Sequence, residues 1–201
     1  MKRFGSNFTA ANPIFLLVIG CFCLLCIASV SSAKELKVDE GYEEAIIRTA
    51  KKGDPQSQFA LALIYEYGTD IIERNPDMAI QWLQKAAKGK VAAACLYLGM
   101  KYEYGNRVKN DLKKAACWYR CAAYQNWPPA QYFLAGLYER GKGVKQSKYL
   151  ALAWFGIAAE QDYPGAAENF SRLFTQEGLK DLAKLREKQK KIMEKVGTPC
   201  N

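Results

Sequence analysis

The feature that most constrains this chain is an internal repeat. Trp82, Trp118 and Trp154 stand 36 residues apart, and an Ala-Ala pair follows each of them at the same offset. A period of this length is typical of stacked, identical supersecondary units. Three further classes of residue keep the same interval to within one residue: Leu61, Leu98 and Leu134; Tyr65, Tyr102 and Tyr138; Gly68, Gly105 and Gly141.

Each repeat is predicted to be a pair of helices. Leu61 and Tyr65 are four residues apart, so they share one face of the first helix. The glycine after them ends that helix, and we expect Gly105 to adopt a positive φ there. Good N-cap residues then begin the second helix, where Trp and an alanine four residues later form the buried stripe. These caps are Asn75, Asp111 and Ser147.

The repeat register extends beyond three units, which we place at about 54–89, 91–126 and 128–162. A half-unit at about 39–52 begins with Asp39 as its cap, and Ile46 and Ala50 take the Trp and Ala positions. At the other end Phe170 and Phe174 take the Leu and Tyr positions. Thr175 is interpreted as the cap of a closing helix at 176–195. The array is thus expected over 34–175, with a capping helix and tail at 176–201.

The third repeat, "AQYFLAGLYERGKGVKQSKYLALAWFGIAAEQDYPGA", resembles the Sel-one-like repeat family, which is related to tetratricopeptide repeats. The second repeat departs from the family pattern at Arg107, where the family has a glycine. The resemblance implies an all-α fold, a right-handed superhelical solenoid of antiparallel helix-turn-helix units. It also implies a protein-binding scaffold or adaptor, without catalysis.

The first 33 residues predict a secretory signal peptide. Lys2 and Arg3 precede a long apolar run, and Ser31 and Ala33 are the small residues expected before cleavage at Lys34. Two alternatives remain open. The apolar run at 14–30 could stay uncleaved as a membrane anchor, and Cys21 in "VIGC" could be the acylated residue of a lipoprotein. The expected location is a bacterial periplasm.

The exposed side of the first helices is the expected binding site, because first helices line the concave surface in tetratricopeptide-like stacks. Tyr97, Lys101 and Tyr104 follow at steps of four and three, which predicts one stripe along the helix. Aromatic and arginine side chains suit a protein or peptide ligand, although an ordinary solvated face remains the alternative. The other residues placed on this face are Tyr67, Tyr132 and Arg140, together with Glu66, Glu103 and Glu139.

Four cysteines follow the predicted signal peptide, and an exported chain can oxidise them. In the cysteine-rich branch of the family one disulfide joins the two helices of a repeat. The resemblance therefore implies a bridge between Cys95 and Cys121, although their spacing is close to that branch's and not the same. In an antiparallel pair Cys121 also lies nearer to Cys95 than Cys117 does. Cys117 and Cys200 would then be free or pair elsewhere.

Catalysis finds little support in the sequence. The chain contains no histidine, which removes the usual general base and the usual metal ligand. We expect no cofactor, no metal and no catalytic residue, and a cell-wall or β-lactam enzyme of the cysteine-rich type is the alternative. The segment 179–195 is rich in lysine, in a chain of formal net charge +9. It could touch an anionic envelope surface, whereas export argues against nucleic acid.

Overall fold

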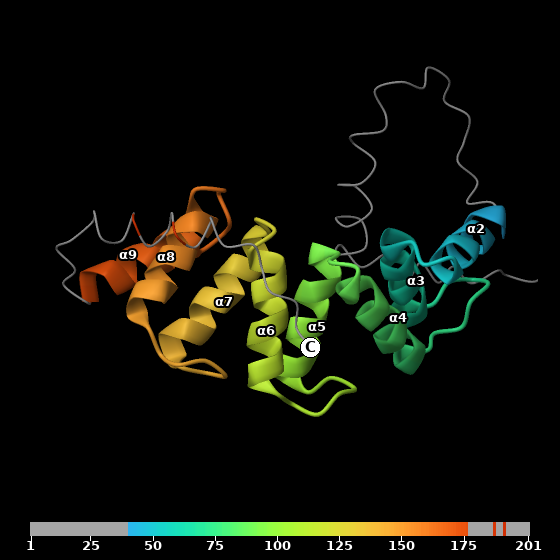
Figure 1. Ribbon diagram of the computed structural model, residues 1–201, viewed down its shortest axis with the longest axis horizontal. Helices are drawn as coiled ribbons and strands as arrows, with labels where there is room; N and C mark the ends of the chain where they lie inside the picture. Colours follow the sequence, from blue (N-terminus) through green and yellow to red (C-terminus); the bar gives the residue numbers. More distant parts are fainter. Residues whose placement is uncertain (1–39, 177–186, 188–190, 192–201) are drawn as a thin grey trace, which may run out of the picture. The chain divides into compact units, whose positions relative to one another are not determined.

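The structure is a computed structural model that describes residues 40–176, Glu187 and Lys191 (Figure 1). The predicted signal peptide at 1–33, the cap Asp39 and Cys200 lie outside these residues. So does nearly all of the predicted closing helix at 176–195, of which Glu187 and Lys191 are helical.

Residues 40–176 form eight α-helices and no strand. Each helix packs against the next one along the chain, so that α3–α4, α5–α6 and α7–α8 are antiparallel hairpins flanked by α2 and α9 (Figure 1). This arrangement confirms the predicted all-α solenoid of helix pairs with half-units at its ends. The helices are α2 (Glu40–Lys51), α3 (Pro55–Tyr67), α4 (Pro76–Lys88), α5 (Ala92–Tyr104), α6 (Leu112–Ala123), α7 (Pro128–Arg140), α8 (Lys148–Ala159) and α9 (Ala166–Gln176).

The predicted helix boundaries within the repeats are confirmed. Asn75, Asp111 and Ser147 cap the second helices, and each side-chain oxygen accepts a hydrogen bond from the backbone N–H three residues later, at 3.0, 3.0 and 3.3 Å. The first helices end at glycines with positive φ, and Gly105 has a left-handed conformation with φ 68°. The motif Tyr-Glu-X-Gly therefore closes the first helix of each repeat.

A second left-handed position recurs in the turn after each second helix. Lys90, Asn126 and Asp162 have φ values of 61°, 59° and 55°. This position lies three residues after the second alanine of each Ala-Ala pair. Here the turn is made by residues that carry a side chain, which is more costly for lysine than for asparagine or aspartate.

The core runs continuously through the helix pairs. Leu61, Leu98 and Leu134 are buried, and so are the first alanines of the three Ala-Ala pairs. Trp82 and Trp154 are buried as predicted, whereas Trp118 is partly buried. None of the helices in residues 40–176 is both long and apolar enough to cross a bilayer.

The last described helix corrects one prediction. Thr175 does not cap a new helix, because it lies in the final turn of α9 and its hydroxyl donates a 2.9 Å hydrogen bond to the Ser171 carbonyl. The large buried side chain of α9 is Leu173. Phe170 and Phe174 on the same helix stack on each other with ring centroids 5.8 Å apart. Thus α9 is the first helix of a fourth, incomplete unit.

Candidate partner-binding surface

A band of aromatic and apolar side chains runs across the first helices, and we call it the first-helix surface. Its members occupy equivalent positions of successive repeats: Phe133 matches Tyr97, and Tyr67 and Arg140 match Tyr104. The surface consists of Tyr67 on α3, Tyr97, Met100 and Tyr104 on α5, and Phe133 and Arg140 on α7.

The exposure of these side chains falls into two groups. Tyr67 and Tyr104 are exposed to 46% and 67%, and Arg140 is also exposed. Tyr97, Met100 and Phe133 are partly buried and pack against the core. The surface therefore offers protruding groups above a fixed apolar base.

Tyr97 is held in place by the neighbouring repeat. Its ring meets the ring of Phe59 on α3 edge-on, with centroids 5.7 Å apart. Burial, together with nearby Tyr67 and Glu66, raises the pKa of Tyr97 to about 12, so the phenol stays neutral over the physiological range. Residues of α3 and α5 thus meet at Tyr97 and make this part of the surface rigid.

Lys101 is not part of this surface, contrary to the prediction. Its side chain is only 8% exposed, and its ammonium group binds both carboxylate oxygens of Glu66 at 2.9 and 3.0 Å. In the later repeats Leu137 and Leu173 occupy the same position, and both are buried. On α5 the first-helix surface includes Met100, one residue earlier, because Lys101 shares the packed side of the helix with Leu98.

The repeated glutamates also face inward more than expected. Each accepts a hydrogen bond from a side chain on a neighbouring helix. Lys101 donates to Glu66, the Tyr119 hydroxyl donates to Glu103 at 2.7 Å, and Arg172 donates to Glu139 at 2.7 Å. All three are partly buried, and the side chain of Glu139 is 16% exposed. The glutamate of the Tyr-Glu-X-Gly motif therefore connects helices and is a structural residue.

Tyr132 has a packing role, which also departs from the prediction. Its ring contacts the rings of Phe133, Phe155 and Tyr163 at centroid distances between 5.2 and 5.9 Å. Its hydroxyl accepts a 3.1 Å hydrogen bond from Asn169 on α9. Tyr132 therefore joins α7, α8 and α9, and it occupies the position of Phe59 and Leu96 in the earlier repeats.

A disulfide joins α5, which carries three residues of the first-helix surface, to α6. Cys95 in the first turn of α5 is bonded to Cys121 near the end of α6, across a Cα–Cα distance of 6.1 Å and a sequence separation of 26. The structure thus contains the predicted bridge. In the other repeats Gln58 and Gln131 stand at the position of Cys95, and each donates a 3.3 Å hydrogen bond to the preceding second helix.

Met100 and Phe133 are surface residues that the sequence analysis missed. The signal for both was present in the repeat itself, since Phe133 is the equivalent of Tyr97 and the position of Lys101 is apolar in the later repeats. As for metal chemistry, residues 40–176 contain no cluster of three or more cysteine, aspartate and glutamate side chains arranged to hold an ion.

Comparison with known proteins identifies the repeat. The family described as Sel1 repeat matches residues 55–90, 92–127 and 128–163. These segments begin within a residue of the starts of α3, α5 and α7, so the sequence family and the helix pairs coincide. No curated protein matches the chain.

Solved structures share the fold. A Sel1 repeat protein from Oxalobacter formigenes is 36% identical, with a TM-score of 0.62 over 64% of this chain and 96% of that one. A protective antigen of uropathogenic Escherichia coli strains that displays an SLR fold is 30% identical, with a TM-score of 0.62 over 76% of this chain but only 33% of its own. Cysteine rich protein B of Helicobacter pylori is 27% identical, with a TM-score of 0.51 over 63% of this chain and 92% of that one.

Proposed function

Because this chain belongs to the Sel1 repeat family, we propose that it is an exported scaffold that binds a protein or peptide on its first-helix surface. Sel1 repeats generally mediate protein–protein interaction. The ligand is a protein of the cell envelope or of a host. One observation carries the proposal: Tyr67 and Tyr104 protrude into solvent at a position that the repeat does not require to be aromatic, since Arg140 occupies it in the third repeat.

The chemistry of the surface supports a macromolecular ligand. Tyrosine and arginine are enriched among the residues that dominate binding energy at protein interfaces. Tyr67 and Tyr104 have few torsions to immobilise, and each presents both an apolar ring and a hydroxyl. The partly buried Tyr97 and Met100 extend the apolar base between them. Such a surface suits a partner that offers apolar side chains and hydrogen-bonding groups together.

The proposed export has two supports. The N-terminal segment has the charge, apolar run and small residues of a secretory signal. The Cys95–Cys121 bridge is also a feature of oxidising compartments. N-terminal sequencing of protein from the envelope fraction tests the proposal, and we expect the mature chain to begin at Lys34. A start at Cys21 with the mass of a lipid would favour a lipoprotein instead, and an intact N-terminus would favour an anchor.

The binding proposal is tested with a double variant, Tyr67→Ala with Tyr104→Ala. The partner is first captured by in-cell cross-linking of the tagged protein, then purified and titrated. Both rings lie outside the buried core, so helical content should stay near wild type. The melting temperature is measured alongside, because the change also removes the hydrogen bond between Tyr67 and Tyr97. The affinity should fall by about tenfold or more, the usual effect of truncating interface anchors.

The matched control is Tyr42→Ala, which removes an equally exposed tyrosine, 63% accessible, from α2 and away from the first-helix surface. It should bind like wild type. If the double variant also retains its affinity, the partner does not use the first-helix surface.

The cell-wall or β-lactam enzyme alternative is tested separately. We expect no turnover of a chromogenic β-lactam by the purified protein. Turnover that a single substitution abolishes would replace the scaffold proposal with an enzymatic one.

A further inference from the structure

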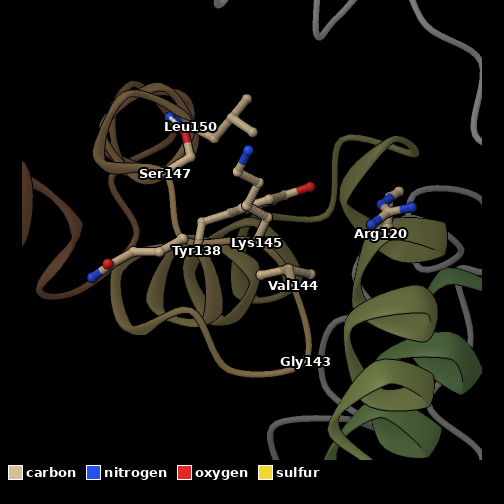
Figure 2. Close-up of a pocket in the computed structure, with 8 residues that line it drawn as sticks. Arg120, Tyr138, Gly143, Val144, Lys145, Ser147 and Leu150 are labelled. Carbon is tan, nitrogen blue, oxygen red and sulfur yellow. Dashed lines mark hydrogen bonds between the residues drawn. The ribbon is translucent and has the colours of Figure 1, made fainter.

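A surface hollow of about 470 Å³ lies at the junction of the second and third repeats, away from the first-helix surface. Arg120 on α6 forms one side, and the loop after α7 forms the other (Figure 2). A volume of this size falls within the range of small-molecule sites. The remaining wall comes from Tyr138, Gly143, Val144, Lys145 and Leu150, with Gln146 and Ser147 beside them.

The loop that forms the hollow is held firmly. The Ser147 N–H donates to the Tyr138 carbonyl at 3.0 Å, and the Gln146 side-chain amide donates to the Glu139 carbonyl at 2.9 Å. Gly143 approaches α6 so closely that an added Cβ would collide with the Leu112 carbonyl group. The walls of the hollow therefore exist before any ligand arrives, which lowers the entropic cost of binding.

The charge in the hollow has one sign. Arg120 and Lys145 both line it, and no acidic residue does. Neither cation forms an ion pair with any residue in the described part of the chain. Arg120 is partly buried, and a guanidinium group forms its strongest hydrogen bonds with an anionic partner such as a carboxylate.

Apolar side chains complete the lining. Val144, Leu150 and Tyr138 are partly buried, and all three line the hollow. In Figure 2, Lys145 lies between Leu150 and Val144, with Arg120 across the hollow. The hollow therefore combines two positive charges with a hydrocarbon wall, a combination that a simple inorganic anion would use only in part.

The preceding junction provides an internal comparison. There Gln84 stands in place of Arg120, Asp111 in place of Ser147, and Lys114 in place of Leu150. The Nζ atom of Lys114 lies 5.4 Å from the centroid of the Tyr102 ring, and Tyr102 is the residue equivalent to Tyr138. The first junction thus lacks the arginine and the leucine, keeps Val108 at the position of Val144, and carries Asp111. Arg120 and Leu150 are therefore the features that distinguish the second junction from the first.

We propose that this hollow binds an organic carboxylate with an apolar body, its carboxylate group held by Arg120 and Lys145 and its hydrocarbon part placed against Val144 and Leu150. The carboxylate could belong to a free acid or to the C-terminus of a peptide chain. This site is separate from the first-helix surface and does not depend on the function proposed for it.

The test uses protein recovered from cells that express the full chain, titrated calorimetrically with defined probes. N-acetyl-leucine carries the proposed chemistry, N-acetyl-leucinamide lacks the charge, and inorganic phosphate lacks the apolar body. We expect saturable binding of the acid, with affinity at least about tenfold above the amide and above phosphate, because hydrogen bonds to charged groups contribute more than neutral ones. Equal binding of the amide or of phosphate, or no binding of the acid, would overturn the proposal.

Two variants assign the site. Arg120→Gln introduces the residue of the first junction and should weaken N-acetyl-leucine about tenfold without changing the melting temperature. Lys109→Gln removes the lysine equivalent to Lys145 from the first junction and should have no effect. Unchanged binding by Arg120→Gln, or an equal loss in both variants, would show that the acid binds elsewhere.

A peptide that ends in leucine with a free carboxylate identifies the source of the ligand. Affinity equal to that of N-acetyl-leucine supports the proposal with a free acid as ligand. Affinity that is tenfold higher, and that is lost in Arg120→Gln, supports it with a peptide C-terminus as ligand.

Discussion

One residue in each repeat has a left-handed backbone where the second helix turns into the next unit. Lys90, Asn126 and Asp162 occupy this position. Asparagine and aspartate tolerate the conformation because their short polar side chains hydrogen-bond locally. Lysine has no such compensation, so the strain should be largest at Lys90.

We therefore predict that Lys90→Gly stabilises the protein. Relief of the strain outweighs the entropy that glycine loses on folding, and the free energy of unfolding should rise by about 0.5–1 kcal/mol. Urea denaturation followed by circular dichroism measures it. Asn126→Gly is the matched control and should give a smaller gain. A lower midpoint for Lys90→Gly would mean that the Lys90 side chain makes a stabilising contact that outweighs the strain.

The ion pair between Lys101 and Glu66 supports a second prediction. Its side chains are 8% and 18% exposed, so Glu66→Ala leaves an ammonium group buried without its carboxylate. This change should destabilise the fold by about 2–3 kcal/mol. The double change Lys101→Leu with Glu66→Gln replaces both partners and introduces at position 101 the leucine that the third repeat has. The free energy of unfolding of this variant should be within about 1 kcal/mol of wild type.

Chemical denaturation of the two variants and of wild type gives the free energies of unfolding that test these expectations. Equal losses in the single and double variants would indicate that the pair itself, and not the unpaired charge, determines stability at this position.

Lys101 also shows where sequence reasoning reached its limit. Met100 and Lys101 are adjacent and differ by about 100° around the helix, so a spacing of three or four residues from Tyr97 fits either one. Only contact with α3 decides between them, and the salt bridge to Glu66 makes burial of the lysine tolerable. Comparison with Leu137 and Leu173 in the later repeats would have indicated the buried position.

The helices themselves were predictable because each one is marked at both ends. Asn75, Asp111 and Ser147 start the second helices, and the glycines end the first ones. Thr175 was misassigned because threonine is equally compatible with a cap and with the last turn of a helix, where its hydroxyl can bond to the carbonyl four residues back. The hollow at Arg120 could not be predicted, because it depends on how closely the loop at Gly143 approaches α6.

The disulfide between α5 and α6 supports a third prediction. Replacing Cys95 and Cys121 with alanine removes a bridge that closes a 26-residue loop, and should cost about 3 kcal/mol of stability. Cys95→Gln with Cys121→Ala should cost less. A glutamine at this position donates to the preceding helix in the first and third repeats, and the Ala87 carbonyl would be its acceptor here.

Thermal melts of both double variants and of wild type provide the comparison. If the glutamine variant is no more stable than the alanine variant, the hydrogen bond seen in the other repeats does not form in the second.

For the whole molecule we predict lability at alkaline pH. Burial raises the pKa of Tyr97 from 10.0 to about 12, and burial together with the Glu103 hydrogen bond also raises the pKa of Tyr119. The folded-state pKa values of these two tyrosines exceed the unfolded ones. Their contribution to the free energy of unfolding is therefore fully present below pH 10 and is lost as the pH rises from there toward 12. Urea midpoints should therefore be clearly lower at about pH 11 than at about pH 8.

Two phenylalanine variants test the origin of this effect. Tyr97→Phe and Tyr119→Phe should each make the urea midpoint less dependent on pH in the alkaline range. A wild-type midpoint that is the same at both pH values would contradict the prediction.

The covalent bond within the second repeat limits how the protein can respond to tension. Stacked repeats pulled from their ends can come apart one unit at a time, because each unit is held mainly by its neighbours. The loop between Cys95 and Cys121 cannot be drawn out while the bond is intact, which shortens the fully stretched chain by roughly 80 Å at about 3.4 Å per residue. In an oxidising compartment the fully stretched protein would therefore stay shorter by this length, and reduction of the Cys95–Cys121 bond would release it.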